Sequence, residues 1–201
     1  MKTEVISVFA NGNGREEALE ITEKTGAFMG LDQKSALRLR LLSEELIELI
    51  RTFSEDIPGS FWLETSDKDV QIHLKTDIPM DLQTRNELLS VSPSGKNAAA
   101  KGLIGKIREM IASVFLPDDP ETKVMTEQAL GFMAQGSQMG SQYGGSYAWS
   151  MNNYVTQVNT APEAEEAKDE LEKSILANLA DDVKVSIVNS EVEVIIYKSF
   201  A

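Results

Sequence analysis

Two glutamates on one predicted helix are the residues of this chain whose type and spacing could do chemistry. Between residues 37 and 53, apolar side chains recur at three- and four-residue steps, which places them on one face of a helix. Glu44 and Glu48 lie four residues apart, roughly opposite that apolar stripe. Two carboxylates on one helical face form either a solvated surface or the wall of a site, and carboxylates can ligate Mg²⁺. What the chain does depends on which of the two this helix presents.

The composition excludes several other kinds of site. The 201 residues include no cysteine and one histidine, His73. Disulfides, thiol catalysis, cysteine-ligated metal centres and sites built on a pair of histidines are therefore excluded. The net charge of −13 opposes binding of nucleic acid, because affinity for phosphates comes from lysine and arginine. We interpret His73 as a structural histidine in a half-buried strand.

No stretch of about 18 apolar residues is present, so we expect no membrane span. Residues 1–12 hold acidic and alternating positions where a signal peptide would have a long apolar stretch. With 42% hydrophobic residues, the chain can bury a sizeable core. We therefore expect a soluble cytoplasmic protein that folds as one domain over residues 1–201.

The hydrophobic pattern predicts antiparallel hairpins and amphipathic helices. The expected elements are a strand at 4–9, helices at 15–29 and from Asp32 or Ser35 to 53, strands at 60–65 and 70–76, helices at 81–89, 97–116 and 163–179, and strands at 183–188 and 191–197. The inward positions of the helix at 15–29 include Phe28. One core is expected to join the helices, with these members: Leu42, Leu46, Leu49, Ile50, Leu103, Ile107 and Ile111. The sequence therefore predicts an α+β fold, a two-layer α/β sandwich whose mostly antiparallel sheet carries helices on one face.

Residues 117–160 differ from the rest of the chain. They are rich in glycine, serine and glutamine but also hold these larger side chains: Met139, Tyr143, Tyr147, Trp149 and Tyr154. Disordered linkers are usually poor in aromatic residues. We therefore expect a long loop, an insert in the domain, whose aromatic side chains dock on the domain itself or on a second copy.

Three short motifs follow this order of elements. Residues 44–50 read EELIELI in the long second helix, residues 77–81 read DIPMD after the first hairpin, and residues 101–105 read KGLIG in the helix at 97–116. With the order of elements, these motifs make the chain resemble the histidine-kinase-like ATPases, and most of all the anti-sigma-factor serine kinases of that superfamily. The order of elements matches over roughly the whole chain, whereas the motifs are only partly kept.

The resemblance implies a pocket for ATP and Mg²⁺. In that pocket Glu44 takes the place of the general base, Glu48 the place of the asparagine that holds Mg²⁺, and Asp77 the place of the aspartate that binds adenine. Four further residues take the places of the phosphate-binding loop and helix terminus: Lys96, Lys101, Gly102 and Gly105.

The motifs also depart from the family pattern. Glu48 replaces the asparagine, and both glycines of the family's adenine motif are missing from residues 77–81. An alignment shifted by one residue puts Glu45 at the base and Leu49 at the metal position, which leaves no metal ligand. Without the resemblance, Glu44 and Glu48 read as a solvated face and Asp77 as a turn residue.

The resemblance leaves two functions open. The first is a bacterial regulatory protein with a degenerate or weak Mg-ATP pocket, which acts by binding a partner protein. The second is an active ATP-binding serine kinase or ATPase of the anti-sigma type. In both cases we expect protein partners, a second copy of the chain among them, and neither nucleic acid nor a membrane.

Overall fold

The computed structural model of the chain describes residues 1–50, 57–78, 146–161, 165–188 and 190–200, together with 103–105, 107 and 111. The expected helix at 81–89, most of the helix at 97–116 and the first part of the expected loop lie outside the described residues.

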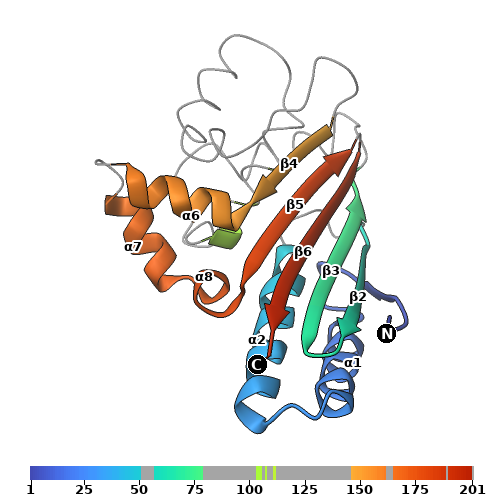
Figure 1. Cartoon of the computed structure of the whole chain (residues 1–201). Coiled ribbons are helices and arrows are strands. Elements are labelled where there is room, and N and C mark those ends of the chain that lie inside the picture. The colour runs from blue at the N-terminus through green and yellow to red at the C-terminus, as the bar shows by residue number, and fades with distance from the viewer. Residues whose placement is uncertain are drawn as a thin grey trace.

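Within the described residues, six strands form one antiparallel sheet in the order β1-β2-β3-β6-β5-β4. The strands are β1 (Ile6–Val8), β2 (Gly59–Ser66), β3 (Asp69–Asp77), β4 (Ser146–Ser150), β5 (Asp182–Val188) and β6 (Glu191–Ser199). The helices are α1 (Arg15–Phe28), α2 (Gln33–Ile50), α6 (Met151–Thr160), α7 (Glu165–Lys173) and α8 (Ile175–Leu179). Figure 1 shows α1 and α2 together across one face of the sheet, and α8 contacts α2. This arrangement confirms the predicted two-layer α+β sandwich.

The β2–β3 hairpin shows why the sheet has one helix-covered face. Phe61 pairs with Leu74 in register, so the two side chains point to the same side of the sheet, and both are buried beneath the helices. Successive residues of a strand point to opposite faces. Trp62 pairs with His73 one residue further on, so these two rings lie on the opposite face. The turn between the strands includes Asp67, whose φ of 51° is left-handed, a conformation that aspartate tolerates.

A glycine turn joins β1 to α1. Gly14 precedes the first residue of α1 with a φ of 77°, in the left-handed region. A Cβ atom at this position would lie 1.9 Å from the carbonyl oxygen of Ser7. Glycine is therefore required here twice, for its backbone angle and for the close approach of α1 to β1.

The core is a single cluster, as predicted. It contains all seven residues named from the sequence, and each of them is at most 3% exposed. Residues from both hairpins and from α6 complete it, so one apolar layer joins the helices to the sheet.

Three expectations about the elements are wrong. Residues 146–160 form β4 and α6 instead of a loop, because Trp149 pairs with Val185 in register and Tyr154 packs in the core. The expected helix at 163–179 is interrupted at Ser174, whose hydroxyl accepts a hydrogen bond of 3.3 Å from the amide of Ala177 and so begins α8.

Phe28 is the third case: it is 70% exposed instead of facing inward. It is the last residue of α1 and stands just before the Met29 cap, where the chain turns towards α2. By contrast, the expectation that aromatic side chains of the insert dock on the domain is confirmed for Trp149 and Tyr154, which are 3% and 1% exposed. Their ring centroids lie 6.0 Å apart.

Candidate functional site

The side of α2 that faces α1 is fixed by polar contacts between the two helices. Thr22 of α1 donates a hydrogen bond of 3.2 Å to the hydroxyl of Ser43, and both side chains are buried. Arg40 forms an ion pair with Glu23 of α1. Glu44 lies on this same side, with Oε1 3.2 Å from Nε of Arg40 and 3.9 Å from Nη2 of Arg15. Glu44 therefore belongs to an ion-pair network between the helices.

Glu45 occupies a different side of α2. Successive residues of an α-helix are rotated by about 100°, which turns Glu45 away from α1. The side chain is half-buried. Burial raises the pKa of the Glu45 carboxyl above its ordinary value, and repulsion from the carboxylates of Glu48 and Glu44 raises it further. A raised carboxyl pKa is found at catalytic sites and also in clusters of acidic residues that have no catalytic role.

The residue one helical turn beyond Glu45 is Leu49. Leu49 is 1% exposed and belongs to the core. Glu48, the candidate metal ligand, is exposed and precedes it by one residue. On the side of α2 turned away from α1, the sequence therefore presents an acid followed after one turn by an apolar side chain, which is the arrangement of the shifted alignment.

Asp77 lies at the same end of the molecule as the last turn of α2. A Cβ atom at Gly59 would lie 2.7 Å from Cδ1 of Ile50 and 2.9 Å from Cδ1 of Leu74. The C-terminal turn of α2 therefore packs over the start of β2 and the end of β3, and Asp77 is the exposed last residue of β3 (Figure 1). The amide of Ile78 donates a hydrogen bond of 2.9 Å to the carbonyl of Ser190, which fixes the chain just after Asp77.

The candidate phosphate-binding residues are described only in part. Gly105 is buried in a helical segment, between Leu103 and Ile107, which belong to the core. Lys96, Lys101 and Gly102 lie outside the described residues. The structure thus brings Glu48 and Asp77 to one end of the fold, places Glu44 against α1, and leaves the phosphate-binding role of the glycines a prediction.

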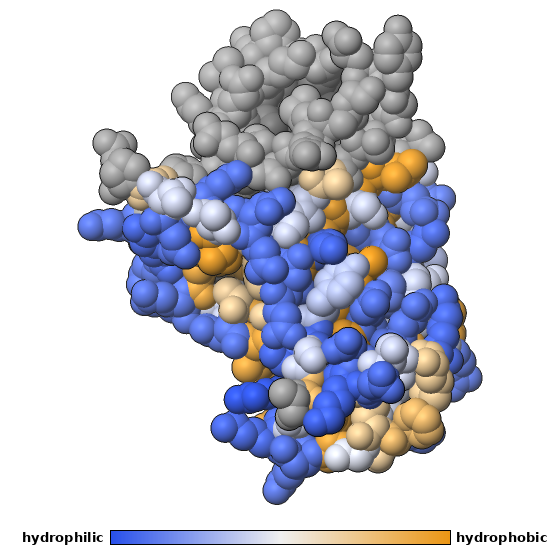
Figure 2. Space-filling model, in the orientation of Figure 1, coloured by the Kyte–Doolittle hydropathy of each residue, from blue (hydrophilic) through white to orange (hydrophobic). Residues whose placement is uncertain are grey.

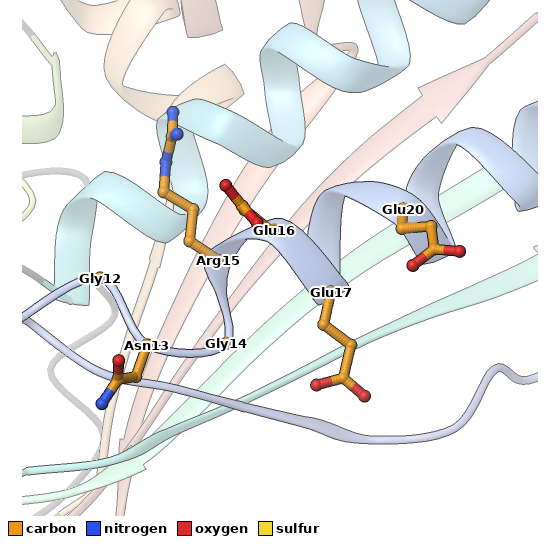
Figure 3. Close-up of a pocket in the computed structure, with 7 residues that line it drawn as sticks. All are labelled: Gly12, Asn13, Gly14, Arg15, Glu16, Glu17 and Glu20. Carbon is orange, nitrogen blue, oxygen red and sulfur yellow. The ribbon is translucent and has the colours of Figure 1, made fainter.

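A pocket of about 640 Å³ lies elsewhere, at the N-terminus of α1 (Figure 3). It is lined by Gly12, Asn13, Gly14, Arg15, Glu16, Glu17 and Glu20. Figure 3 shows the Glu17 and Glu20 side chains directed away from that of Arg15. Three carboxylates against one guanidinium make this pocket unfavourable for a triphosphate, although a helix N-terminus alone favours anions. Among the described residues, no group of three or more side chains has the arrangement of a metal site.

His73 has structural partners, in agreement with its interpretation from the sequence. Its ring stacks on Trp62 with centroids 4.6 Å apart and planes inclined by 10°. Its Nδ1 lies 3.1 Å from Oε1 of Glu193. Lys2 covers the other ring, with Nζ 4.6 Å from the Trp62 centroid. These side chains form a packed network on the face of the sheet opposite α1 and α2.

The apolar pattern of the sequence does not distinguish Glu44, the predicted base, from Glu45, the alternative, whereas the structure gives the two side chains different surroundings. Ser43 is the sequence feature that marks the flank of α2 next to α1: it is a small polar residue at which α2 approaches Thr22 of α1. A pattern of apolar residues identifies the buried face of a helix but not the neighbour on each flank. That neighbour decides which of two adjacent acids is taken into the ion pairs between α1 and α2.

No membrane-spanning candidate occurs among the helices that the structure describes. Comparison with models of known protein families finds none that matches this chain, and a search of curated proteins finds no significant match either.

Proposed function

We propose that the chain is a regulatory protein of the histidine-kinase-like ATPase type, with a pocket that holds Mg-ATP weakly and with a partner protein as its main ligand. The observation that carries this proposal is the apolar Leu49 one turn beyond Glu45. In the alignment shifted by one residue, Leu49 takes the position at which the family that the chain resembles holds the metal ion through a side-chain oxygen. A leucine offers no such oxygen, so the metal ion loses a ligand.

Electrostatics supports weak nucleotide binding. Glu44, Glu45 and Glu48 lie within two turns of one helix, and Glu44 is paired with guanidinium groups of both helices. The net charge of the chain is −13. A triphosphate that enters near these carboxylates is repelled unless a divalent cation neutralises it locally. Binding without Mg²⁺ is therefore weaker still.

Few aromatic side chains of the described residues are exposed for contact with a partner protein. Trp149 and Tyr154 are buried inside the domain, so their rings already have their packing partners. The acidic surface remains, and it suits a partner with a basic binding site. Contact with such a partner weakens as salt is added, because exposed charges are screened.

A second candidate function is the active kinase or ATPase, and Glu45 favours it. Burial raises the pKa of its carboxyl above the ordinary value, which is the direction that favours proton acceptance by a general base. In this case Glu45, and not Glu44, activates the hydroxyl of the protein substrate or a water molecule. Glu48 would then supply carboxylate oxygens for Mg²⁺, and Asp77 would bind the adenine.

Two substitutions separate the two assignments of the metal position, Leu49 and Glu48. Isothermal titration calorimetry with ATP and Mg²⁺ is carried out on Leu49→Asn, with Leu49→Ala as the control for lost packing, and on Glu48→Asn. If Leu49 stands at the metal position, Leu49→Asn strengthens Mg-dependent binding and Glu48→Asn changes it little. Stronger binding in Glu48→Asn, with no gain in Leu49→Asn, assigns the metal position to Glu48 and contradicts the proposal. If the unchanged chain releases phosphate from ATP and the Glu45→Gln variant does not, the result supports the active enzyme.

A further inference from the structure

The turn between β1 and α1 contains two asparagine–glycine pairs in succession, Asn11-Gly12 and Asn13-Gly14. Such pairs are prone to spontaneous deamidation, because glycine has no side chain that hinders ring closure. In this reaction the backbone nitrogen of the glycine attacks the side-chain carbonyl carbon of the asparagine. The two pairs are identical in sequence, so a difference in their reactivity has to come from the fold.

Both reacting groups of the first pair are held by hydrogen bonds. The side-chain Oδ1 of Asn11 accepts a hydrogen bond of 3.0 Å from the amide of Asn13. The attacking group of this pair, the amide of Gly12, donates a hydrogen bond of 3.0 Å to the carbonyl of Phe9. The amide nitrogen has to lose its proton in order to attack, and this proton is engaged in the turn. Ring closure at Asn11 therefore requires both hydrogen bonds to break.

The reacting groups of the second pair are not held in this way. Within the part of the chain that the structure describes, neither the Asn13 side chain nor the Gly14 amide takes part in a hydrogen bond. The Asn13 side chain is exposed, and Figure 3 shows it directed away from that of Arg15. The main-chain carbonyl of Asn13 accepts a hydrogen bond of 3.0 Å from the amide of Phe9, but its oxygen is retained in the reaction.

We propose that Asn13 is a site of spontaneous deamidation and that the fold protects Asn11 from the same reaction. The Gly14 nitrogen gives its proton to a solvent base and forms a bond to Cγ of Asn13. The bond between Cγ and Nδ2 then breaks, ammonia leaves, and a cyclic imide (a succinimide) remains. Water opens the imide at either carbonyl, which produces aspartate or isoaspartate at position 13. The reaction consumes only water and involves no oxidation.

The isoaspartate product does not fit the turn as it stands. It carries the main chain through the former side chain, which inserts one more carbon just before Gly14. There is little room for the displacement, because a Cβ atom at Gly14 would already lie 1.9 Å from the carbonyl oxygen of Ser7. The new carboxylate also joins the three glutamates that line the pocket at the start of α1. Deamidation therefore weakens the packing of α1 on β1 and distinguishes old copies of the chain from new ones.

Peptide mapping by mass spectrometry tests the proposal on the full chain. The folded protein is incubated at mildly alkaline pH, which favours loss of the amide proton, and isoaspartate is labelled with an isoaspartate methyltransferase. We expect Asn13 to deamidate at least about tenfold faster than Asn11, because two hydrogen bonds hold the reacting groups of Asn11. The chain unfolded in guanidinium chloride is the control. It lacks these hydrogen bonds, so both pairs are expected to react at similar rates.

Two matched variants assign the label to one residue. Asn13→Ser removes the reacting side chain and is expected to reduce labelling of the folded chain to background. Asn11→Ser keeps a side-chain oxygen that accepts a hydrogen bond in such a turn, and labelling is expected to persist. Circular dichroism confirms that both variants are folded. The isoaspartate form, isolated by ion exchange, is expected to have a lower Tm than the unmodified chain.

Four results would overturn the proposal. The folded chain resists deamidation at both asparagines, or the two react equally fast in it. Labelling persists in Asn13→Ser. The preference for Asn13 is the same in the unfolded chain, which would make it a property of the sequence and not of the fold. An unchanged Tm of the isoaspartate form would contradict the predicted weakening of the turn. None of these outcomes depends on the nucleotide pocket.

Discussion

Two leucines of α2 allow the central packing of the fold to be measured within one helix. Leu46 is fully buried in the cluster that joins α2 to the sheet, whereas Leu37 is 55% exposed. The substitutions Leu46→Ala and Leu37→Ala remove the same atoms and change helix propensity by the same small amount. The difference between their effects therefore reports burial alone.

The magnitude follows from the atoms removed. Leucine loses three carbons, and at about 0.8 kcal/mol per buried carbon the transfer cost is about 2.4 kcal/mol. The cavity left around Leu46 adds to this, so Leu46→Ala is expected to lower the free energy of unfolding by about 3–5 kcal/mol. Leu37→Ala is expected to lower it by less than about 1 kcal/mol, because more than half of the side chain already contacts water.

Urea unfolding provides the assay, followed by the fluorescence of Trp62 and Trp149 and by circular dichroism. Both variants are compared at the same protein concentration. A lower midpoint with an unchanged m value shows lost stability instead of a changed unfolded state. Equal losses for the two leucines, or a loss under about 1 kcal/mol for Leu46→Ala, refute the assignment of this face to the core.

Three further predictions concern backbone, charge and capping. Gly14→Ala is expected to destabilise the fold by more than about 3 kcal/mol in urea unfolding, because the new Cβ meets the Ser7 carbonyl and cannot move away. Gly30→Ala, with open space around it, costs only about 1–2 kcal/mol in the same assay. Glu45→Gln is expected to stabilise the protein at neutral pH by less than about 1 kcal/mol, since half of the side chain is solvated. Because the folded-state pKa of Glu45 is raised, its ionisation lowers stability as the pH rises through that pKa, and the gain in Tm disappears in acid, below the ordinary pKa of the group. A gain that persists there contradicts this reading. Asp182→Ala is expected to lower stability by about 1–2 kcal/mol in thermal unfolding, because the Asp182 carboxylate accepts hydrogen bonds that hold the first turn of α6; an unchanged Tm excludes that role.

The hairpins and the long helix could be predicted because their signals are local. Alternation in β2, β3, β5 and β6 and the helical spacing in α2 each lie within one element, and their bounds agree with the structure to within a few residues. β4 and α6 could not be predicted in the same way. Whether these residues form a strand and a helix depends on the pairing of Trp149 with Val185, a contact between residues far apart in the sequence.

The sequence pattern distinguishes the residues of the candidate site less sharply than the elements of the fold, for a related reason. Glu44 and Glu45 are equivalent in the sequence pattern, since both lie off the apolar stripe. The surroundings of the two glutamates differ only once α1 packs on one flank of α2, because Glu44 then forms ion pairs with Arg15 and Arg40. The exposure of Phe28 likewise depends on how the chain leaves α1, which helical periodicity does not describe.

Thermal unfolding with ATP in the presence of Mg²⁺, and again in a chelator, tests the central claim most directly. Ligand at a hundredfold excess over its Kd stabilises the native state by about 2.7 kcal/mol, which raises the Tm of a domain of this size by about 5–11 °C. With Leu49 at the metal position, we predict a rise of less than about 2 °C at about 1 mM ATP with Mg²⁺, and none in the chelator. A rise above about 5 °C that requires Mg²⁺ would contradict the weak pocket and establish a working nucleotide site.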